Sequence, residues 1–256
     1  MSLEFDAVSP MLDAAGVPQD GTLVVHSSFR GLSRAGYRAE PFIEALLERM
    51  NGGNLLMPAM SWRIVTPDQP VWDDLATPSH VGVLTEVFRT CYAQHRSIHP
   101  THSVSAYGPA TLRLLDGHHR DDTPCSANSP WGRLAESGAH ILLLGIGFER
   151  CTALHHPEEI AAASIYLEAP EDAGTYRCSA RDGTVFDVRF RRHRQLDRDF
   201  PQYAPRLNAR GRLRTGDIAG VRWMAVSARD LMEDAFANLG AQLDAHIKSH
   251  ESGSAG

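Results

Sequence analysis

The chain has 256 residues, 43% of them hydrophobic, and its formal net charge is −6. That much apolar sequence suffices for one large core, and the mild acidity argues against nucleic acid as a partner while favouring a cationic small molecule. The sequence contains neither an apolar run long enough to cross a bilayer nor a charged-then-apolar leader at its start, so we expect a cytoplasmic protein without a membrane span.

The first sixty residues predict a helix followed by a strand–helix–strand unit of a parallel sheet. Apolar patterns and glycine stops place helices at 5–15 and 40–50, and strands at 23–25 and 54–58. His26 ends the first strand, and the serine- and glycine-rich loop SSFRGLSRAG follows it. Because small residues let backbone N–H groups approach a ligand, this loop predicts a cradle for a phosphate or amide group.

The middle of the chain alternates loops with short regular elements. Residues 61–80 carry tryptophans and prolines with little periodicity, which is typical of a long loop that shapes a binding site. Regular elements are expected at 82–91 (helix), 103–107 (strand), 110–115 (helix) and 129–136 (a short helix). His95, His99 and His102 lie close together in sequence, but no acidic or thiol side chain joins them at a short spacing, so we expect no metal.

The segment ILLLGIGFERCTALHHPEE contains the strongest chemical signal. Residues 141–146 form an apolar run that predicts a strand buried on both faces, and glycines then turn the chain into a helix that starts near Thr152. On that helix His155 and Glu158, three residues apart, share one face at the carboxyl edge of the sheet. Because a carboxylate can orient an imidazole and raise its basicity, the pair predicts a general base.

The C-terminal third predicts antiparallel strands and a closing helix. The Asp-Gly turn at 182–183 lies between apolar residues and predicts a hairpin over 176–191 that joins and widens the sheet. A strand region in GDIAGVRWMAVSA and an amphipathic helix over 229–246 follow. We therefore expect one α/β domain over 1–248, with a mixed, mostly parallel sheet, and a flexible tail at 249–256.

Six segments together resemble, in order and spacing, the aminoglycoside 3-N-acetyltransferase family. They are VVHSSFRGLSRAG, NLLMPAMSW, TPSHVGVLTEVFR, RSIHPTHSVSAYGP, SPWGRL and LLLGIGFERCTALHHPEE. The resemblance implies a three-layer αβα sandwich and acetyl-coenzyme A as co-substrate, held between the 26–33 loop and the 145–155 turn. It also implies His155 as the base with Glu158 behind it, and His26 nearby. The positions implied to line the coenzyme cleft are Ser27, Ser28, Ser33, Arg96, Ser97 and Thr152.

The chemistry that this resemblance implies is direct acetyl transfer from the thioester to an amine. Because an amine with a pKa well above neutrality arrives protonated, His155 would accept its proton while Glu158 holds the tautomer and stabilises the imidazolium. The thioester oxygen needs preorganised donors, for which Ser27, Ser28, His26 and loop N–H groups are candidates.

The acceptor is expected to be a polycationic amine, namely the 3-amino group of an aminoglycoside. Carboxylates expected to hold it are Asp73, Asp74, Asp121, Asp122 and Glu168. Three alternatives remain: a family member that acetylates another amine of natural-product metabolism, a hydrolase with Cys125 or Cys151 as nucleophile, and a non-catalytic small-molecule binding protein. The four cysteines form no C-x-x-C pair, so we expect free thiols.

Overall fold

The structure, a computed structural model, describes residues 3–248. Its α-helices and strands in chain order are α1 (Leu3–Ala14), β1 (Thr22–Ser27), α2 (Arg30–Arg34), α3 (Ala39–Arg49), β2 (Asn54–Pro58), β3 (Val71–Asp73), α4 (Val83–Val87), β4 (His95–Arg96), β5 (Val104–Tyr107), α5 (Thr111–Leu115), β6 (His140–Leu144), α6 (His155–Tyr166), β7 (Gly174–Ser179), β8 (Val185–Phe190), α7 (Tyr203–Ala209), β9 (Arg214–Ile218), β10 (Val221–Ser227) and α8 (Ala228–Ala241). A π-helical turn, Phe88–Tyr92, extends α4, and a 3₁₀ turn, Thr152–Leu154, leads into α6.

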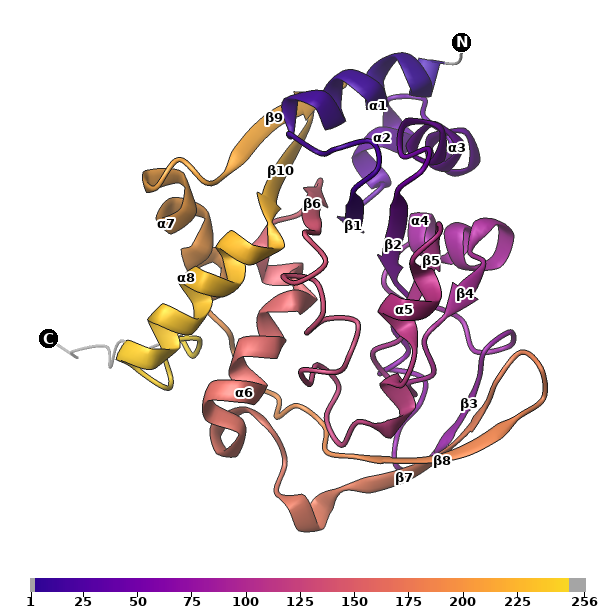
Figure 1. The fold of residues 1–256 in the computed structure, drawn as a ribbon, viewed down its shortest axis with the longest axis vertical. Coiled ribbons are helices and arrows are strands. Elements are labelled where there is room, and N and C mark those ends of the chain that lie inside the picture. The colour runs from indigo at the N-terminus through magenta and orange to yellow at the C-terminus, as the bar shows by residue number, and fades with distance from the viewer. Residues whose placement is uncertain (1–2, 249–256) are drawn as a thin grey trace, which may run out of the picture.

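A seven-stranded mixed sheet with the order β4-β5-β2-β1-β6-β10-β9 forms the centre of the molecule (Figure 1). β1 pairs in parallel with β2 and β6, while the remaining pairs of this sheet in the described chain are antiparallel. The expected mixed sheet is confirmed, but it is not mostly parallel. Short connections explain the antiparallel pairs β4–β5 and β9–β10, because strands joined by a few residues can only pair antiparallel.

The β9–β10 connection shows how local geometry sets this pairing. Ala219 and Gly220 form its two-residue loop, with φ angles of 52° and 80°. Positive φ at both central positions is the geometry of a tight hairpin turn whose twist matches that of the strands. The hairpin that extends the main sheet is therefore β9–β10.

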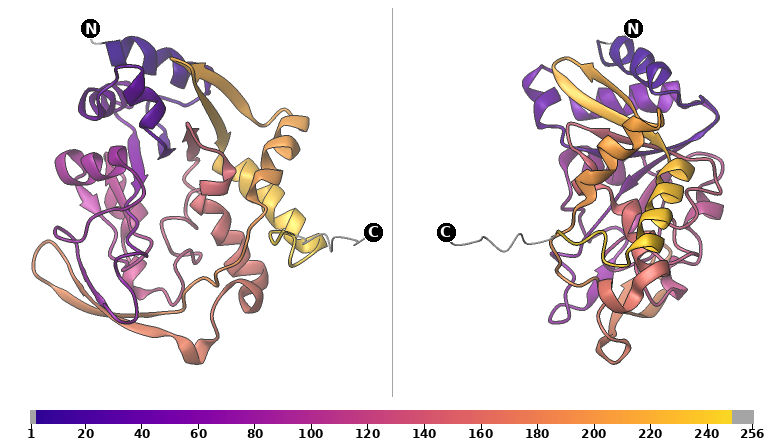
Figure 2. Two further views of the ribbon diagram at one scale, coloured as in Figure 1. Left: turned by 180° about the vertical axis from the view of Figure 1, so that it is seen from behind. Right: turned by 90° about the vertical axis from the view of Figure 1, so that its left-hand side faces the viewer.

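Helices cover both faces of the main sheet, and β6 shows why. Leu142 and Leu144 pack into a core shared with α1 and α3, whereas Ile141 and Leu143 pack into a second core shared with α5 and α8. Alternate residues of an unbroken apolar strand point to opposite faces, so both faces need a covering layer. The result is the expected αβα arrangement, with α6 and α8 side by side on one flank (Figure 2).

The hairpin over 176–191 forms as expected, but its predicted place in the main sheet is wrong. β7 and β8 pair with each other, and β7 pairs in parallel with β3, which gives a separate three-stranded sheet (Figure 1). Trp72, Tyr176 and Phe190 belong to a small core of its own beneath this sheet. The segment 61–80, expected as a loop, thus supplies the partner strand that draws the hairpin away.

One further expected element, the short helix at 129–136, differs from the structure. This segment is a series of turns. The Ser129 hydroxyl donates to the carbonyl of Ser126 and accepts from Gly132 N. The flexible tail expected at 249–256 lies outside the described residues, and the single domain stays a prediction. No helix within residues 3–248 combines the length and hydropathy needed to cross a membrane.

Candidate active site

A cleft with a volume of about 930 Å³ opens at the carboxyl ends of β1 and β6. Residues of the loop after β1, the turn after β6, the start of α6 and the segment 192–200 line it. Gly145 lets the two loops approach, because it has a φ of +67° and a Cβ there would lie 2.8 Å from the Ser28 carbonyl oxygen. The 26–33 loop and the 145–155 turn therefore enclose a cleft, as expected.

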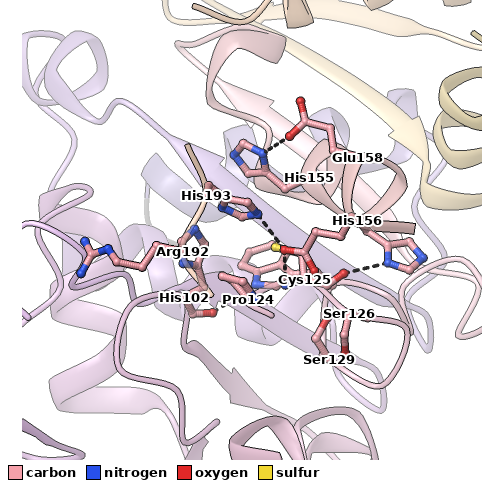
Figure 3. A network of polar contacts seen from close by, with 12 residues as sticks. His102, Pro124, Cys125, Ser126, Ser129, His155, His156, Glu158, Arg192 and His193 are labelled. Carbon is pink, nitrogen blue, oxygen red and sulfur yellow. Dashed lines mark hydrogen bonds and ion pairs between the residues drawn. The ribbon is translucent and has the colours of Figure 1, made fainter. Parts of the chain in front are cut away.

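His155 and Glu158 meet as their spacing predicts (Figure 3). His155 is the first residue of α6, and its Nδ1 lies 2.8 Å from Glu158 Oε2. An ionised carboxylate only accepts, so Nδ1 carries the proton and Nε2 keeps its lone pair. Because the ring lines the cleft, Nε2 is the nitrogen available to a bound molecule.

Glu158 is fully buried and receives three donors. Arg198 Nε lies 3.0 Å from each carboxylate oxygen, and His246 Nδ1 lies 3.1 Å from Oε1. Burial opposes ionisation, but the charge and hydrogen bond of His155, the bond from His246 and the charge of Arg198 outweigh it and lower the pKa of Glu158 well below its usual value. Glu158 is therefore ionised at neutral pH, behind the imidazole.

A chain of hydrogen bonds continues beyond Glu158. With Nδ1 of His246 donating to the carboxylate, its Nε2 accepts from the Tyr203 hydroxyl at 2.5 Å. His246 is fully buried and belongs to the segment after α8. The C-terminal part of the described chain thus reaches back to hold the Glu158 carboxylate.

The His155 ring lies in an aromatic environment. It stacks on His193 with ring centroids 4.3 Å apart, and Phe200 packs edge-on at 5.2 Å. Burial lowers the pKa of His155 to about 4, with His193 adding to this shift and Glu158 opposing it. The ring is neutral at pH 7 and can accept a proton.

His26 and Ser27 also line the cleft from the end of β1, and each holds an unused polar atom. His26 Nε2 and Ser27 Oγ are buried without a hydrogen-bond partner in the described chain. Burial lowers the pKa of His26 to about 4. The Ser28 N–H, in contrast, donates to the carbonyl of Leu144 at 2.8 Å and is already used.

The positions expected to hold the coenzyme divide into two groups. Ser27, Ser28, Ser33 and Thr152 line the cleft. Arg96 and Ser97 do not, which corrects the expectation for these two residues. Arg96 is buried and donates to three backbone carbonyls and to Ser103 Oγ, while Ser97 Oγ contacts His118 Nδ1 at 2.9 Å. Both side chains are fixed in the interior.

None of the five carboxylates expected to hold the acceptor lines the cleft, so their expected place at the site is wrong. Asp73 Oδ1 accepts from two backbone N–H groups of its own turn, Asp74 pairs with Arg181, and Asp122 pairs with Arg191. Asp121 is buried, and Glu168 Oε2 accepts from the Arg192 N–H. Their sequence position in loops carried no information on where those loops fold.

The two cysteines weighed as nucleophiles are poorly suited to that role. Cys125 and Cys151 are buried, and burial raises the pKa of Cys151 to about 12 and that of Cys125 well above its usual value. A thiol attacks as its thiolate, so neither side chain is activated in this structure.

The described lining of the cleft is rich in arginine. It includes Arg30, Arg63, Arg150, Arg192, Arg194 and Arg198, against one carboxylate, Glu149. Arg192 and Arg198 are held by internal hydrogen bonds, whereas Arg30, Arg150 and Arg194 make no ion pair within the described residues. The cleft therefore has a positive rim, although the whole chain is negative.

Sequence reasoning missed Arg198, His193 and His246. Arg198 lies 40 residues from Glu158 and His246 lies 88 residues away, so no local spacing connects them. The one available signal was the basic, histidine-containing run RRHRQLDR, which follows β8.

His26, His155, Glu158 and Arg198 fall inside a region that matches a protein family, whereas His246 lies beyond its end. Residues 24–239 match the family described as aminoglycoside 3-N-acetyltransferase. The chain belongs to this family. A curated family member, aminoglycoside N(3)-acetyltransferase VIII from Streptomyces fradiae, is 31% identical over 188 residues, which cover 65% of each chain. The match therefore spans slightly less than two thirds of that enzyme.

Solved structures of the family have the same fold. The apoenzyme of aminoglycoside acetyltransferase AAC(3)-IVa superposes with a TM-score of 0.77 at 25% identity, covering 95% of this chain and 91% of that one. AAC-IIIb in binary complex with CoASH has a TM-score of 0.76 at 22% identity, covering 93% and 96%.

Proposed function

We propose that this family member transfers the acetyl group of acetyl-coenzyme A to an amine, with His155 as the general base. The observation that carries the proposal is the His155–Glu158 pair: a neutral imidazole at the surface of the cleft, with a buried anion 2.8 Å behind it. This is the arrangement that a base needs if it is to become cationic during the reaction.

In the proposed step the amine nitrogen attacks the thioester carbon while His155 Nε2 accepts a proton from it. The imidazolium that forms faces Glu158, whose negative charge stabilises it, and Arg198 and His246 keep that carboxylate in place. The carbon–sulfur bond then breaks, and the coenzyme leaves as a thiolate that takes up a proton. Because Glu158 is held ionised, it acts by charge and orientation and does not itself receive the proton.

The thioester oxygen becomes negative in this step and needs donors that are already in place. His26 Nε2 and Ser27 Oγ are the candidates that the geometry favours, since both are at the cleft and neither is used by a protein partner in the described chain. The Ser28 N–H is excluded because it is bonded to the carbonyl of Leu144.

The positive rim supports a coenzyme with several phosphate groups. Arg30, Arg150 and Arg194 line the cleft without a carboxylate partner among the described residues, so they can pair with phosphate oxygens. The family likeness to a protein solved with CoASH supports the same assignment.

The family suggests the 3-amino group of an aminoglycoside as the acceptor. One observation favours a second candidate, a less cationic amine. Within the described lining, Glu149 is the only carboxylate, and its Oε1 already accepts from Gly147 N. A polycation would meet more arginine than acid there, which raises the electrostatic cost of binding it.

The test is amine-dependent release of coenzyme A thiol from acetyl-coenzyme A, measured with a panel of aminoglycosides and with mono- and diamines of low charge. Mass spectrometry of the product checks for one added acetyl group, and NMR gives its position. Turnover of aminoglycosides supports the first acceptor, and turnover restricted to the other amines supports the second. No thiol release with any amine, and no thermal shift at millimolar coenzyme, would contradict the proposal.

A further inference from the structure

A second group of reactive side chains lies directly behind the catalytic histidine. A sulfur, a carboxylate oxygen and a ring nitrogen, from Cys125, Glu159 and His193, all lie within 4.8 Å of one another. His193 lies between His155 and Cys125 (Figure 3). The three residues come from the turns after α5, from α6, and from the segment after β8.

Glu159 gives this cluster the features of a built site. Its side chain is 1% exposed, and its Oε1 accepts from Cys125 N at 2.8 Å and from His193 Nε2 at 2.7 Å. Its Oε2 is buried and has no hydrogen-bond partner in the described chain. A buried carboxylate oxygen without a donor is costly, and a cation is the natural partner for it.

We propose that Cys125 Sγ, the Glu159 carboxylate and His193 Nε2 bind one divalent transition-metal ion, with zinc as the best fit. Thiolate, imidazole and carboxylate are the ligands that zinc takes in proteins, whereas magnesium and calcium prefer oxygen alone. Three protein ligands leave the fourth tetrahedral position to water. Since His193 lines the cleft, a cation and water can reach the cluster from that side.

The charges and protons of such a site balance. A thiolate and a carboxylate together carry two negative charges, which neutralise a divalent cation, so the filled site adds no net charge to the interior. Cys125 must lose its thiol proton to solvent. The ring proton of His193 must move from Nε2 to Nδ1, so that coordination of the metal ion replaces the hydrogen bond between Nε2 and Glu159. No oxidation or reduction is involved.

Sequence patterns carry no sign of this site because its ligands are far apart. Cys125 and Glu159 are separated by 34 residues, and so are Glu159 and His193. The expectation of no metal rested on short spacings around His95, His99 and His102, and none of those three residues belongs to the proposed set. The inference does not depend on the proposed function.

The test uses the full-length protein, reduced and freed of metal with a chelator. Titration with Co²⁺ should give one equivalent bound, with a thiolate-to-cobalt charge-transfer band that Zn²⁺ displaces. Cys125→Ser should lose the band, and Glu159→Gln should bind Zn²⁺ more weakly by about tenfold or more. The matched control is Cys178→Ser, which changes an equally buried thiol in the small sheet and should keep band and affinity.

The metal titrations can either support or overturn the proposed site. The proposal holds if the band needs Cys125 and the affinity needs Glu159, and it is overturned if wild type shows no band or if Cys125→Ser keeps it. Should Cys125→Ser fail to fold, His193→Gln at the cleft surface replaces it. A loss of affinity of about tenfold or more then supports the site, and unchanged affinity in a folded protein overturns it.

Discussion

Glu158 is the carboxylate on which three donor side chains of the site converge. It accepts from His155, Arg198 and His246 while being fully buried. A buried anion is tolerated only where partners replace the water it has lost. Each donor also becomes fixed in position, so one carboxylate both stabilises the fold and orients the His155 ring.

Replacing Glu158 by Gln should therefore cost stability as well as activity. The amide removes the charge that balances Arg198, and we expect the free energy of unfolding to fall by about 3 kcal/mol, the low end for a broken buried ion pair because Arg198 reaches the cleft. Equilibrium denaturation in urea measures it. Glu149→Gln is the control, since this carboxylate is exposed, and it should change stability by no more than about 0.5 kcal/mol. Equal midpoints for Glu158→Gln and wild type would contradict this account.

Sequence reasoning at the residue scale succeeded where partners are close in the chain. The three-residue spacing of His155 and Glu158 on a helix was enough to place their side chains together. Arg198, His193 and His246 were missed because their contacts depend on how distant segments fold back. The misplaced carboxylates, such as Asp74, show the same limit, since a loop's charge does not reveal which way the loop turns.

Two strand ends position the site at the element scale. β1 and β6 pair in parallel, so both loops that follow them leave the sheet at one edge. Gly145 allows these loops to touch, since a Cβ at this residue would meet the Ser28 carbonyl oxygen. A backbone atom cannot move aside as a flexible side chain can.

Gly145→Ala should thus destabilise the protein and weaken coenzyme binding. A left-handed backbone costs Ala about 1–2 kcal/mol. Gly16→Ala is the matched control, because Gly16 has a similar φ of +70° and no atom lies within 4 Å of the place that an alanine methyl would occupy. The clash with Ser28 should make Gly145→Ala less stable than this control by about 1 kcal/mol or more. Thermal and urea denaturation of both variants measures this difference. Equal losses of stability in Gly145→Ala and Gly16→Ala would show that the contact between Gly145 and the Ser28 carbonyl is unimportant.

The elements themselves were predictable to different extents. The buried pattern of β6 and the turn at 182–183 are local, and the strands they predict are present. The single strand region expected in GDIAGVRWMAVSA is instead a hairpin of two strands, β9 and β10. The separate sheet was not predictable, because β7 pairs with β3, about one hundred residues earlier, through a three-residue strand in a proline-rich loop. Pairing over such a distance leaves no periodic signal.

Across the whole molecule, several buried histidines of the described chain are held neutral. Burial lowers the pKa of His26 to about 4 and that of His118 to about 3, and it lowers the pKa of His99 well below its usual value. His118 is held neutral between Ser97 Oγ and the carbonyl of Pro124, and His99 stacks on it at 4.4 Å. The fold thus excludes protons that the unfolded chain would bind.

Stability should accordingly fall as the pH drops below about 6.5, the ordinary histidine pKa. Between that pH and about 4 the unfolded chain binds protons on His26 and His118 that the folded chain does not, so each contributes a loss approaching about 1.4 kcal/mol per pH unit. Urea denaturation at several pH values measures the slope. His118→Asn should reduce the slope of the unfolding free energy against pH by the contribution of about one bound proton. His95→Gln, at an exposed position, should leave this slope unchanged. A stability that is constant from pH 7 to pH 5 would contradict the prediction.

The proposed function requires one cleft that binds the coenzyme and His155 as the base. The most direct test compares kcat and coenzyme affinity in His155→Ala, measured by thiol release and by calorimetry. Because proton removal matters only as the new bond forms, kcat should fall by about 10²-fold or more while the coenzyme Kd stays nearly unchanged. His80→Ala is the control, since His80 lines the same cleft without a carboxylate partner in the described chain and should keep kcat within about threefold. A folded His155→Ala variant with wild-type kcat would show that His155 is not the base.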